Sequence, residues 1–147
     1  MCQNYAKAEL MKIKRYDAQI DSLISEVLRI RGLALKVTAT LSGDVGGGFG
    51  NKDKIADAVA RIVDLEKEIN HRIDALVDLK KRLLIVVEKL PEANYISVLY
   101  RRYFLYESFE KISADLGYSY RNICYIHGKA LQELNENLKG EVKDEPD

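Results

Sequence analysis

The chain has 147 residues, which is enough for one domain, or for a small domain together with an elongated one. Hydrophobic residues make up 47% of it and charged residues 31%, a composition that is typical of soluble helical proteins and argues against a wholly disordered chain. The formal net charge is zero, so nucleic acid would have to be attracted by a local arrangement of cations.

Cysteine content and hydropathy predict the compartment. Cys2 and Cys124 are too few and too far apart in sequence for a disulfide framework. The longest apolar run, at residues 83–87, is far too short to span a bilayer, and the first residues lack the apolar core of a signal peptide. We therefore expect a cytoplasmic protein that has no membrane partner.

Residues 1–90 are predicted to form a long antiparallel helical hairpin. Apolar residues recur at helical spacing from about residue 5 to residue 40, and residues 36–41 have weaker helix propensity and are predicted to begin the loop. Residues 42–51 contain five glycines, which is typical of a flexible connector. A phosphate-binding loop would need a Gly-Lys-Ser/Thr sequence after a strand, and this stretch has neither.

The second hairpin helix is predicted over residues 52–90, where apolar residues follow nearly a heptad rhythm. A two-helix hairpin buries one stripe per helix and is poorly stable alone, so we expect this element to form a homo-oligomer. Glu68 and His71 have the Glu-x-x-His spacing of di-iron bundles, but the companion ligands are missing. A surface histidine is the better interpretation.

Residues 91–134 are predicted to be a three-helix unit that begins after Pro91. Ser108 is a suitable N-cap for a helix over residues 109–116, and Gly117 can adopt the left-handed conformation that ends this helix. Ser119 is a suitable N-cap for the next helix. Two helices joined by a short turn that contains Gly are the helix-turn-helix signature. In such a pair the second helix lies in the DNA major groove.

The last helix of this unit has two different faces on a helical wheel. Its inner side is apolar, and its outer side carries Arg121, Tyr125, Gly128 and Gln132, with Asn122 and Lys129 beside them. Arg and Asn suit bidentate contacts with guanine and adenine. Gly128 costs about 1 kcal/mol in a helix relative to Ala, but it leaves room for a sugar-phosphate backbone. This pattern favours a DNA-reading helix.

Several residues near this helix have a second interpretation that the sequence leaves open. Tyr120 and Tyr125 suit DNA contacts or packing, whereas Tyr100 and Tyr103 are expected in the core. Arg101 and Arg102 suit either DNA-backbone contacts or a solvated face. Cys124 is expected to be an ordinary half-buried cysteine, with a redox switch as the alternative.

Three segments of this region resemble region four of bacterial sigma factors, which reads the −35 promoter element. They are residues 98–103 (VLYRRY), 109–113 (FEKIS) and 119–123 (SYRNI), and Lys129, Ala130 and Leu131 ahead of Leu134 are similar to the end of that motif. Ser113 stands where Ala is usual. The layout of the whole chain resembles small phage regulators of the RinA/ArpU kind, and this resemblance implies an activator of phage late genes.

The sequence thus predicts an all-α protein with a hairpin at residues 1–90, a helix-turn-helix domain at residues 91–134 and an acidic disordered tail at residues 135–147. We expect a sequence-specific regulator of transcription that binds double-stranded DNA as a homo-oligomer, with RNA polymerase as a further candidate partner. The expected base readers and their neighbours are Ser119, Tyr120, Arg121, Asn122, Cys124 and Tyr125. The expected backbone contacts are Arg101, Arg102, Lys111 and Lys129.

Residues 91–134 carry as many anions as cations, so one copy would make about 3–5 charged phosphate contacts and would bind weakly at physiological salt. No nucleophile, carboxylate pair or metal-ligand cluster has the companions it needs, so we predict no enzyme activity, no cofactor and no metal. Two alternatives remain, a DNA-packaging recognition subunit of the small-terminase kind and a helical protein-interaction module that does not bind DNA.

Overall fold

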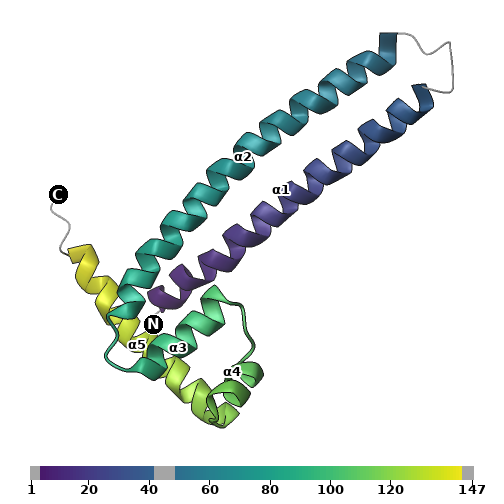
Figure 1. Cartoon of the computed structure of the whole chain (residues 1–147). Coiled ribbons are helices and arrows are strands. Elements are labelled where there is room, and N and C mark those ends of the chain that lie inside the picture. Colours follow the sequence, from purple (N-terminus) through teal and green to yellow (C-terminus); the bar gives the residue numbers. More distant parts are fainter. Residues whose placement is uncertain (1–3, 42–48, 144–147) are drawn as a thin grey trace. The chain divides into compact units, whose positions relative to one another are not determined.

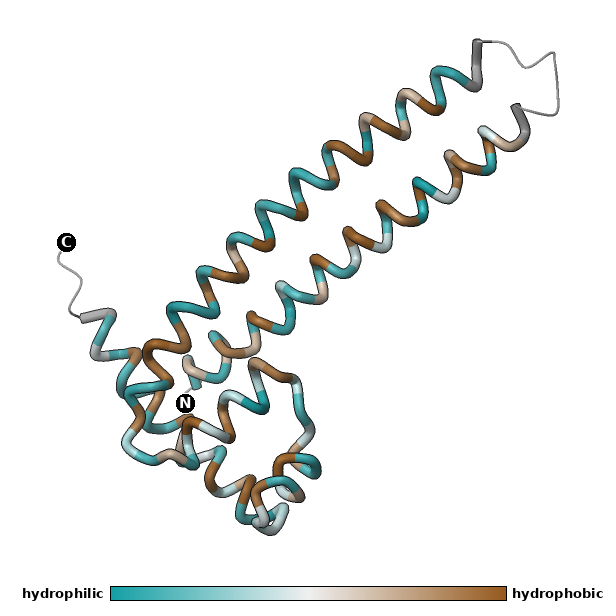
Figure 2. The backbone as a smooth tube through the Cα atoms, viewed as in Figure 1, coloured by the Kyte–Doolittle hydropathy of each residue, from teal (hydrophilic) through white to brown (hydrophobic). Residues whose placement is uncertain are grey.

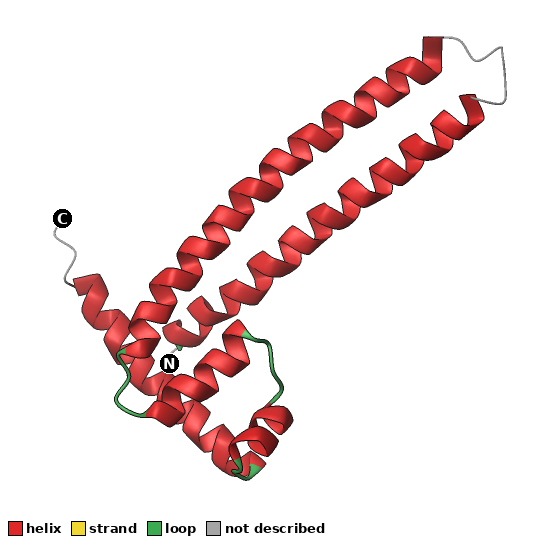
Figure 3. Cartoon of the chain, in the orientation of Figure 1, coloured by secondary structure: helices red, strands yellow, loops and turns green. Residues whose placement is uncertain are grey.

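The computed structural model describes residues 4–41 and 49–143, and within them the chain is helical with short connections and no strand (Figures 1 and 3). The all-α prediction is confirmed. The helices in order are α1 (Tyr5–Leu41), α2 (Phe49–Glu88), α3 (Ala93–Leu99), the π-helix η1 (Tyr100–Phe104), α4 (Phe109–Leu116) and α5 (Tyr120–Lys143).

The chain divides into two units, and α1 and α2 contribute to both of them. One unit consists of residues 17–75, and the other combines the start of the chain up to residue 16 with everything from residue 76 onward. We call them the hairpin unit and the C-terminal unit. The predicted domain boundary at residue 90 therefore differs from the observed division, because the start of α1 and the end of α2 belong to the C-terminal unit.

The hairpin unit consists of two antiparallel helices, as predicted. Ile20, Val27 and Leu65 are buried along the seam, and hydrophobic positions recur along both helices in Figure 2. Arg31 Nη2 lies 2.6 Å from Glu66 Oε1, and Arg72 Nη1 donates to Gln19 Oε1 at 2.8 Å. Exposed ion pairs contribute about 0–1 kcal/mol, so the apolar seam is the main source of stability in this unit.

The ends of the two long helices differ from the prediction. α1 continues through residues 36–41, where Val37 is half-buried and the Thr38 hydroxyl donates to the Ala34 carbonyl at 2.9 Å. α2 begins at Phe49, so residues 49–51 are helical and do not belong to a loop. Residues 42–48 of the predicted Gly-rich connector lie outside the described residues.

The C-terminal unit has a core to which the long helices, α3, η1, α4 and α5 all contribute. α3 packs against α5, and α4 packs against both α5 and η1. The fully buried side chains include Leu10 and Ile13 of α1, Leu83 of α2 and Leu134 of α5. Their burial explains why segments predicted to belong to the hairpin lie in this unit.

The prediction of a disordered tail from residue 135 is wrong for residues 135–143, because α5 continues to Lys143. Leu138 is buried, and the Asn135 side chain accepts a hydrogen bond of 3.2 Å from the backbone N–H of Ala6. Lys89 also pairs with Glu141 at 3.5 Å. The prediction rested on the acidic composition of this segment, which does not reveal its contacts with α1 and α2. Residues 144–147 lie outside the described residues.

Candidate nucleic-acid interface

The turn between α4 and α5 has the local geometry that its sequence predicts. The Ser108 hydroxyl accepts from the Lys111 N–H at 3.2 Å, and the Ser119 hydroxyl accepts from the Asn122 N–H at 3.1 Å, so both serines are N-caps. Gly117 has φ 75°, a left-handed conformation that glycine adopts without steric cost. The capped ends fix where each helix begins.

Ser113 has a role in this turn that the sequence did not reveal. Its hydroxyl donates to the Tyr118 carbonyl at 2.5 Å, and the Tyr118 phenol accepts from the Asn94 amide at 3.1 Å. The backbone N–H groups of Gly117 and Tyr118 both donate to the Ser113 carbonyl. Ser113 therefore braces the turn from both of its oxygens, which an alanine could not do.

The inner face of α5 is anchored in an apolar cluster. Ile112 of α4, Val98 of α3 and Ile123 of α5 have no exposed surface, and Ile126 is buried beside them. Tyr95, Phe109 and Leu116 pack against this cluster. A helix buried along one stripe in this way presents its opposite stripe to solvent.

The outer face of α5 is exposed, as the wheel predicted. We define this outer face by Tyr120, Arg121, Cys124, Tyr125, Gly128 and Lys129. The Tyr125 side chain is 64% exposed, and the Lys129 ammonium lies 5.7 Å from the centre of its ring. A Cβ atom added at Gly128 would meet no atom within 4 Å, so the surface there is open. Asn122 is half-buried at the edge of this face.

Two outer-face residues have surroundings that bear on their chemistry. Cys124 is an exposed free thiol, so its interpretation as a half-buried cysteine is wrong. The pKa of the Tyr120 phenol is raised, first by the neighbouring Cys124 and then by Glu110. A tyrosine hydroxyl is protonated at neutral pH even without such a shift, so Tyr120 can donate a hydrogen bond.

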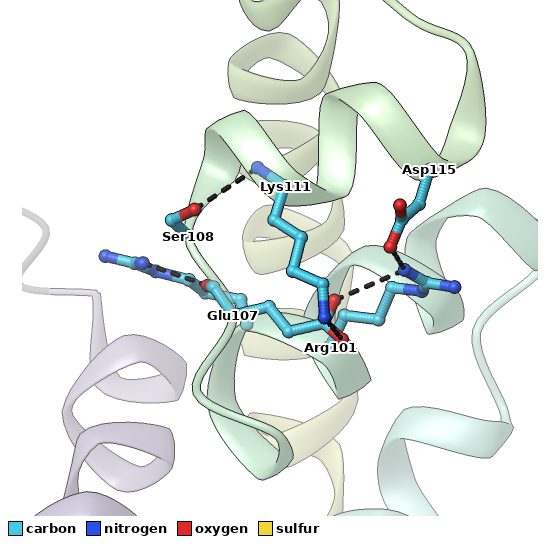
Figure 4. Close-up of polar contacts among 6 residues, drawn as sticks. Arg101, Glu107, Ser108, Lys111 and Asp115 are labelled. Atoms are coloured by element: carbon cyan, nitrogen blue, oxygen red, sulfur yellow. Dashed lines mark hydrogen bonds and ion pairs between the residues drawn. The ribbon is translucent and has the colours of Figure 1, made fainter.

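The cations of η1 and α4 form contacts inside the unit, gathered around Glu107 (Figure 4). Arg101 pairs with Asp115 at 2.8 Å and with Glu107 at 3.2 Å, and Lys111 lies 3.5 Å from the same Glu107 carboxylate. Arg102 donates to the Glu107 carbonyl at 3.1 Å and lies 4.4 Å above the Phe109 ring. These contacts tie η1 to the start and end of α4.

This network adds a third role to the two that the sequence left open for the arginines. Arg101 already has two carboxylate partners, and Arg102 has a carbonyl and an aromatic ring. Either would have to exchange a contact within the unit for a phosphate. Lys111 remains largely exposed, and its contact with Glu107 is longer than those of the arginines, so it is the most available cation of the three.

His127 is a residue whose contacts sequence analysis did not predict. Its Nε2 lies 2.8 Å from the Tyr103 hydroxyl, and its ring meets Phe109 edge-on at 4.9 Å. Burial, with the charges of Lys7 and Arg102, lowers the His127 pKa to about 4, and burial raises that of Tyr103 to about 12. Both groups are neutral at pH 7 and join α5 to η1. The position of His127 beside the apolar stripe was the available signal.

The two tyrosines expected in the core differ from one another. Tyr103 is buried, as predicted. Tyr100 is partly exposed and stacks on Phe104 at 5.3 Å, so the core prediction is wrong for this residue. Both belong to η1, and its wider π-helical turn changes which positions face inward relative to an α-helix.

Neither a metal centre nor a membrane span is found in the parts of the chain that the structure describes. No three His, Cys, Asp or Glu side chains gather there in a way that could hold a metal ion. Glu68 is paired with Arg72 at 2.9 Å, and His71 is exposed, which fits a surface histidine. None of the described helices has an apolar stretch of bilayer-spanning length.

Comparisons of the chain with protein-family models, with curated protein sequences and with solved structures find no match.

Proposed function

We propose that this protein is a sequence-specific DNA-binding regulator of transcription that inserts α5 into the major groove. The observation that carries the proposal is the two-faced character of α5. Its inner stripe is buried against α3 and α4, and its outer face presents Arg121, Tyr125 and Lys129 around the open surface at Gly128. This combination of a fixed helix and exposed hydrogen-bonding side chains is what base recognition needs.

Each outer-face residue has a role that follows from its chemistry and position. Arg121 is the reader of a guanine edge, and Asn122 is the reader of an adjacent adenine from the edge of the face. Tyr125 contacts a thymine methyl or a base edge. Ser119, Tyr120 and Lys129 contact the phosphates beside the groove, and Cys124 lies between them, close to the bases.

The available positive charge limits how tightly one copy can bind. Because Arg101 and Arg102 are held by closer partners, the more available cations near the outer face are Arg121, Lys129 and Lys111, all three of which are exposed. About three phosphate neutralisations give a salt slope near −3 for one copy, which corresponds to weak binding at physiological salt. A homo-oligomer with two reading helices is therefore part of the proposal.

The proposed biological setting rests on the resemblance to phage regulators of the RinA/ArpU kind. It implies an activator of phage or mobile-element late genes in a bacterial cytoplasm, with RNA polymerase as a contact of the DNA-bound protein. The outer face of α5 supports only the DNA-reading part of this proposal.

The test is a selection of bound fragments from randomised DNA, followed by binding measurements on the recovered site at several salt concentrations. Arg121→Ala should cost about 1–3 kcal/mol on that site and relax the preference at one base pair. Arg121→Lys is the matched control, because it keeps the charge but loses the planar fork of donors. Equal affinity of the wild type and Arg121→Lys on every duplex would show that Arg121 contacts only phosphate.

A second candidate function is favoured by one observation on the hairpin unit. Apolar side chains such as Leu28, Leu35 and Val59 are more than half exposed there. Exposed apolar groups that recur along a helix indicate a protein-binding surface. If the folded protein selects no DNA sequence even at low salt, the helical protein-interaction module is the better description.

A further inference from the structure

The hairpin unit has two unlike sides, and the Arg31–Glu66 ion pair identifies one of them. This pair bridges α1 and α2 at 2.6 Å, so the faces on which Arg31 and Glu66 stand adjoin one another. Residues three, four or seven positions away on a helix share a face. On this side the structure places six exposed apolar residues, which are Ile24, Leu28 and Leu35 of α1 and Val59, Val63 and Ile73 of α2. We call it the apolar side.

The opposite side of the hairpin unit is largely polar, although Leu33, seven residues after Glu26, is an exposed apolar residue there. Glu26 pairs with Arg29 at 2.9 Å, and the charge of Arg61 on α2 also lowers the Glu26 pKa, so α1 and α2 approach each other there too. Arg72 links Glu68 with Gln19 along the same hairpin. The larger group of exposed apolar residues on the hairpin unit therefore lies on the apolar side.

The register of the hairpin aligns the apolar residues in pairs. Ile24 stands seven residues before Arg31, and Ile73 stands seven residues after Glu66, so in antiparallel helices they lie at the same level. Leu35, four residues after Arg31, lies level with Val63, three residues before Glu66. We call each level pair, Ile24 with Ile73 and Leu35 with Val63, an apolar rung. The apolar side thus has one rung on each side of the Arg31–Glu66 ion pair.

We propose that a second copy of this chain covers the apolar side, so that two hairpins form a four-helix bundle. The end of each hairpin at residues 41 and 49, which we call its tip, points the same way in both copies. Rotation of one hairpin by half a turn about its long axis lays α1 over the partner's α2. Arg31 then faces the partner's Glu66, and each apolar rung meets an apolar rung. The alternative end-to-end arrangement would stack Arg31 on the partner's Arg31, which like-charge repulsion opposes.

The size of the apolar side suits a dimer. The α1 part of the unit has about 25 residues, so it is about 37 Å long, and two helices about 10 Å apart make a face about 20 Å wide. Each copy would then bury on the order of 700 Å², close to the roughly 800 Å² per partner of a stable interface. In a two-fold dimer the same patch of both copies forms the interface, so the patch must be complementary to itself. The apolar side meets this requirement.

This dimer would place two α5 helices for binding one DNA duplex, and that role rests on the proposed DNA-binding function. Both connections from the hairpin unit to the C-terminal unit, at residues 16–17 and 75–76, leave from the end opposite the tip. A dimer with parallel tips brings the two pairs of connections to one end, and each pair leads to a C-terminal unit with its own α5. Two copies of the weakly charged outer face can then act on one duplex.

The test is the self-association of the full chain without DNA, measured by analytical ultracentrifugation over a concentration series. Leu28→Glu should weaken the dimer by more than about tenfold, because it places a charge on the apolar side, between Ile24 and the Arg31–Glu66 ion pair. Leu33→Glu is the matched control. Leu33 is 47% exposed on the same helix but lies outside the apolar side, so this variant should leave association within about twofold.

The orientation has its own test, with Cys2→Ser and Cys124→Ser as the background. Ile24→Cys and Ile73→Cys chains are mixed and treated with a short thiol crosslinker. Parallel tips predict a crosslinked heterodimer that neither variant forms alone. A dimer that gives no crosslinked heterodimer from the mixed variants would overturn that orientation.

A wild-type chain that remains a monomer, or equal effects of Leu28→Glu and Leu33→Glu, would overturn the proposed dimer. These outcomes are separate from the DNA test, because none of the measurements contains DNA. A dimer that binds no DNA sequence would contradict the proposed function and leave this interface standing. A monomer that selects a DNA sequence would do the reverse.

Discussion

The hairpin unit and the C-terminal unit are both built from amphipathic helices, but different contacts hold them together. In the C-terminal unit, six helices (α1, α2, α3, η1, α4 and α5) contribute to a shared core, and the Ser108 and Ser119 side chains cap the starts of α4 and α5. The hairpin unit has one apolar seam and several exposed ion pairs, and it leaves large apolar side chains in solvent. The difference teaches that the C-terminal unit buries a core shared by many helices, whereas the hairpin unit buries a single seam, which the proposed dimer would extend.

The largest effect that distinguishes the two units should come from their cores. Ile123→Ala removes a side chain with no exposed surface and should lower the free energy of unfolding by about 2–5 kcal/mol. Ile30→Ala, at a half-buried position of the hairpin seam, should cost less than half as much. The free energies of unfolding of both variants are measured by urea denaturation at equal protein concentration. Equal losses would mean that the seam is packed as tightly as the C-terminal core.

Ion pairs offer a second contrast of intermediate size. Glu9 is buried and accepts from Arg82 at 2.8 Å and from Lys12, whereas Glu66 is exposed in its pair with Arg31. Glu9→Gln should therefore cost about 1–3 kcal/mol of unfolding free energy, and Glu66→Gln about 0–1 kcal/mol. Thermal unfolding of the two variants is the comparison. A larger loss for Glu66→Gln would contradict the distinction.

Each unit contains one histidine, and acid should act on them differently. The pKa of His127 is lowered to about 4, first by burial, so between pH 6.5 and 4 the unfolded chain binds a proton that the folded chain does not. The free energy of unfolding should fall by about 1–2 kcal/mol across that window, after allowance for the partial exposure of the ring.

Replacement of each histidine separates its contribution to this acid sensitivity. His127→Phe should reduce the loss of stability between pH 7 and pH 5, whereas His71→Gln, at an exposed position of the hairpin, should leave it unchanged. Urea titrations at the two pH values measure it. An unchanged pH dependence in His127→Phe would assign the effect to other groups.

The smallest expected change in stability is at the outer face of α5. Gly128→Ala should raise the free energy of unfolding by up to about 1 kcal/mol, because the added methyl group meets no atom and alanine favours the helix. Gly140→Ala is a matched control on the same helix with the same open surroundings. If the DNA backbone approaches Gly128, only Gly128→Ala should also weaken DNA binding. Equal DNA affinity of both variants would remove Gly128 from the interface.

Local signals in the sequence were sufficient for much of the fold and of the outer face. The caps at Ser108 and Ser119 and the left-handed Gly117 each depend on a few adjacent residues, and helical periodicity identified the inner and outer sides of α5. The extension of α5 to Lys143 depends on contacts with α1 and α2. The π-helix, the Glu107 network and the His127–Tyr103 contact likewise arise only when distant segments meet.

The most direct test of the DNA-reading face is an NMR titration of the isotope-labelled chain with the duplex recovered by selection. The account predicts that the largest amide shifts fall at Arg121, Tyr125, Gly128 and Lys129, and that the hairpin unit shifts little. Shifts confined to the hairpin unit, or no selective shifts with any duplex at low salt, would contradict it.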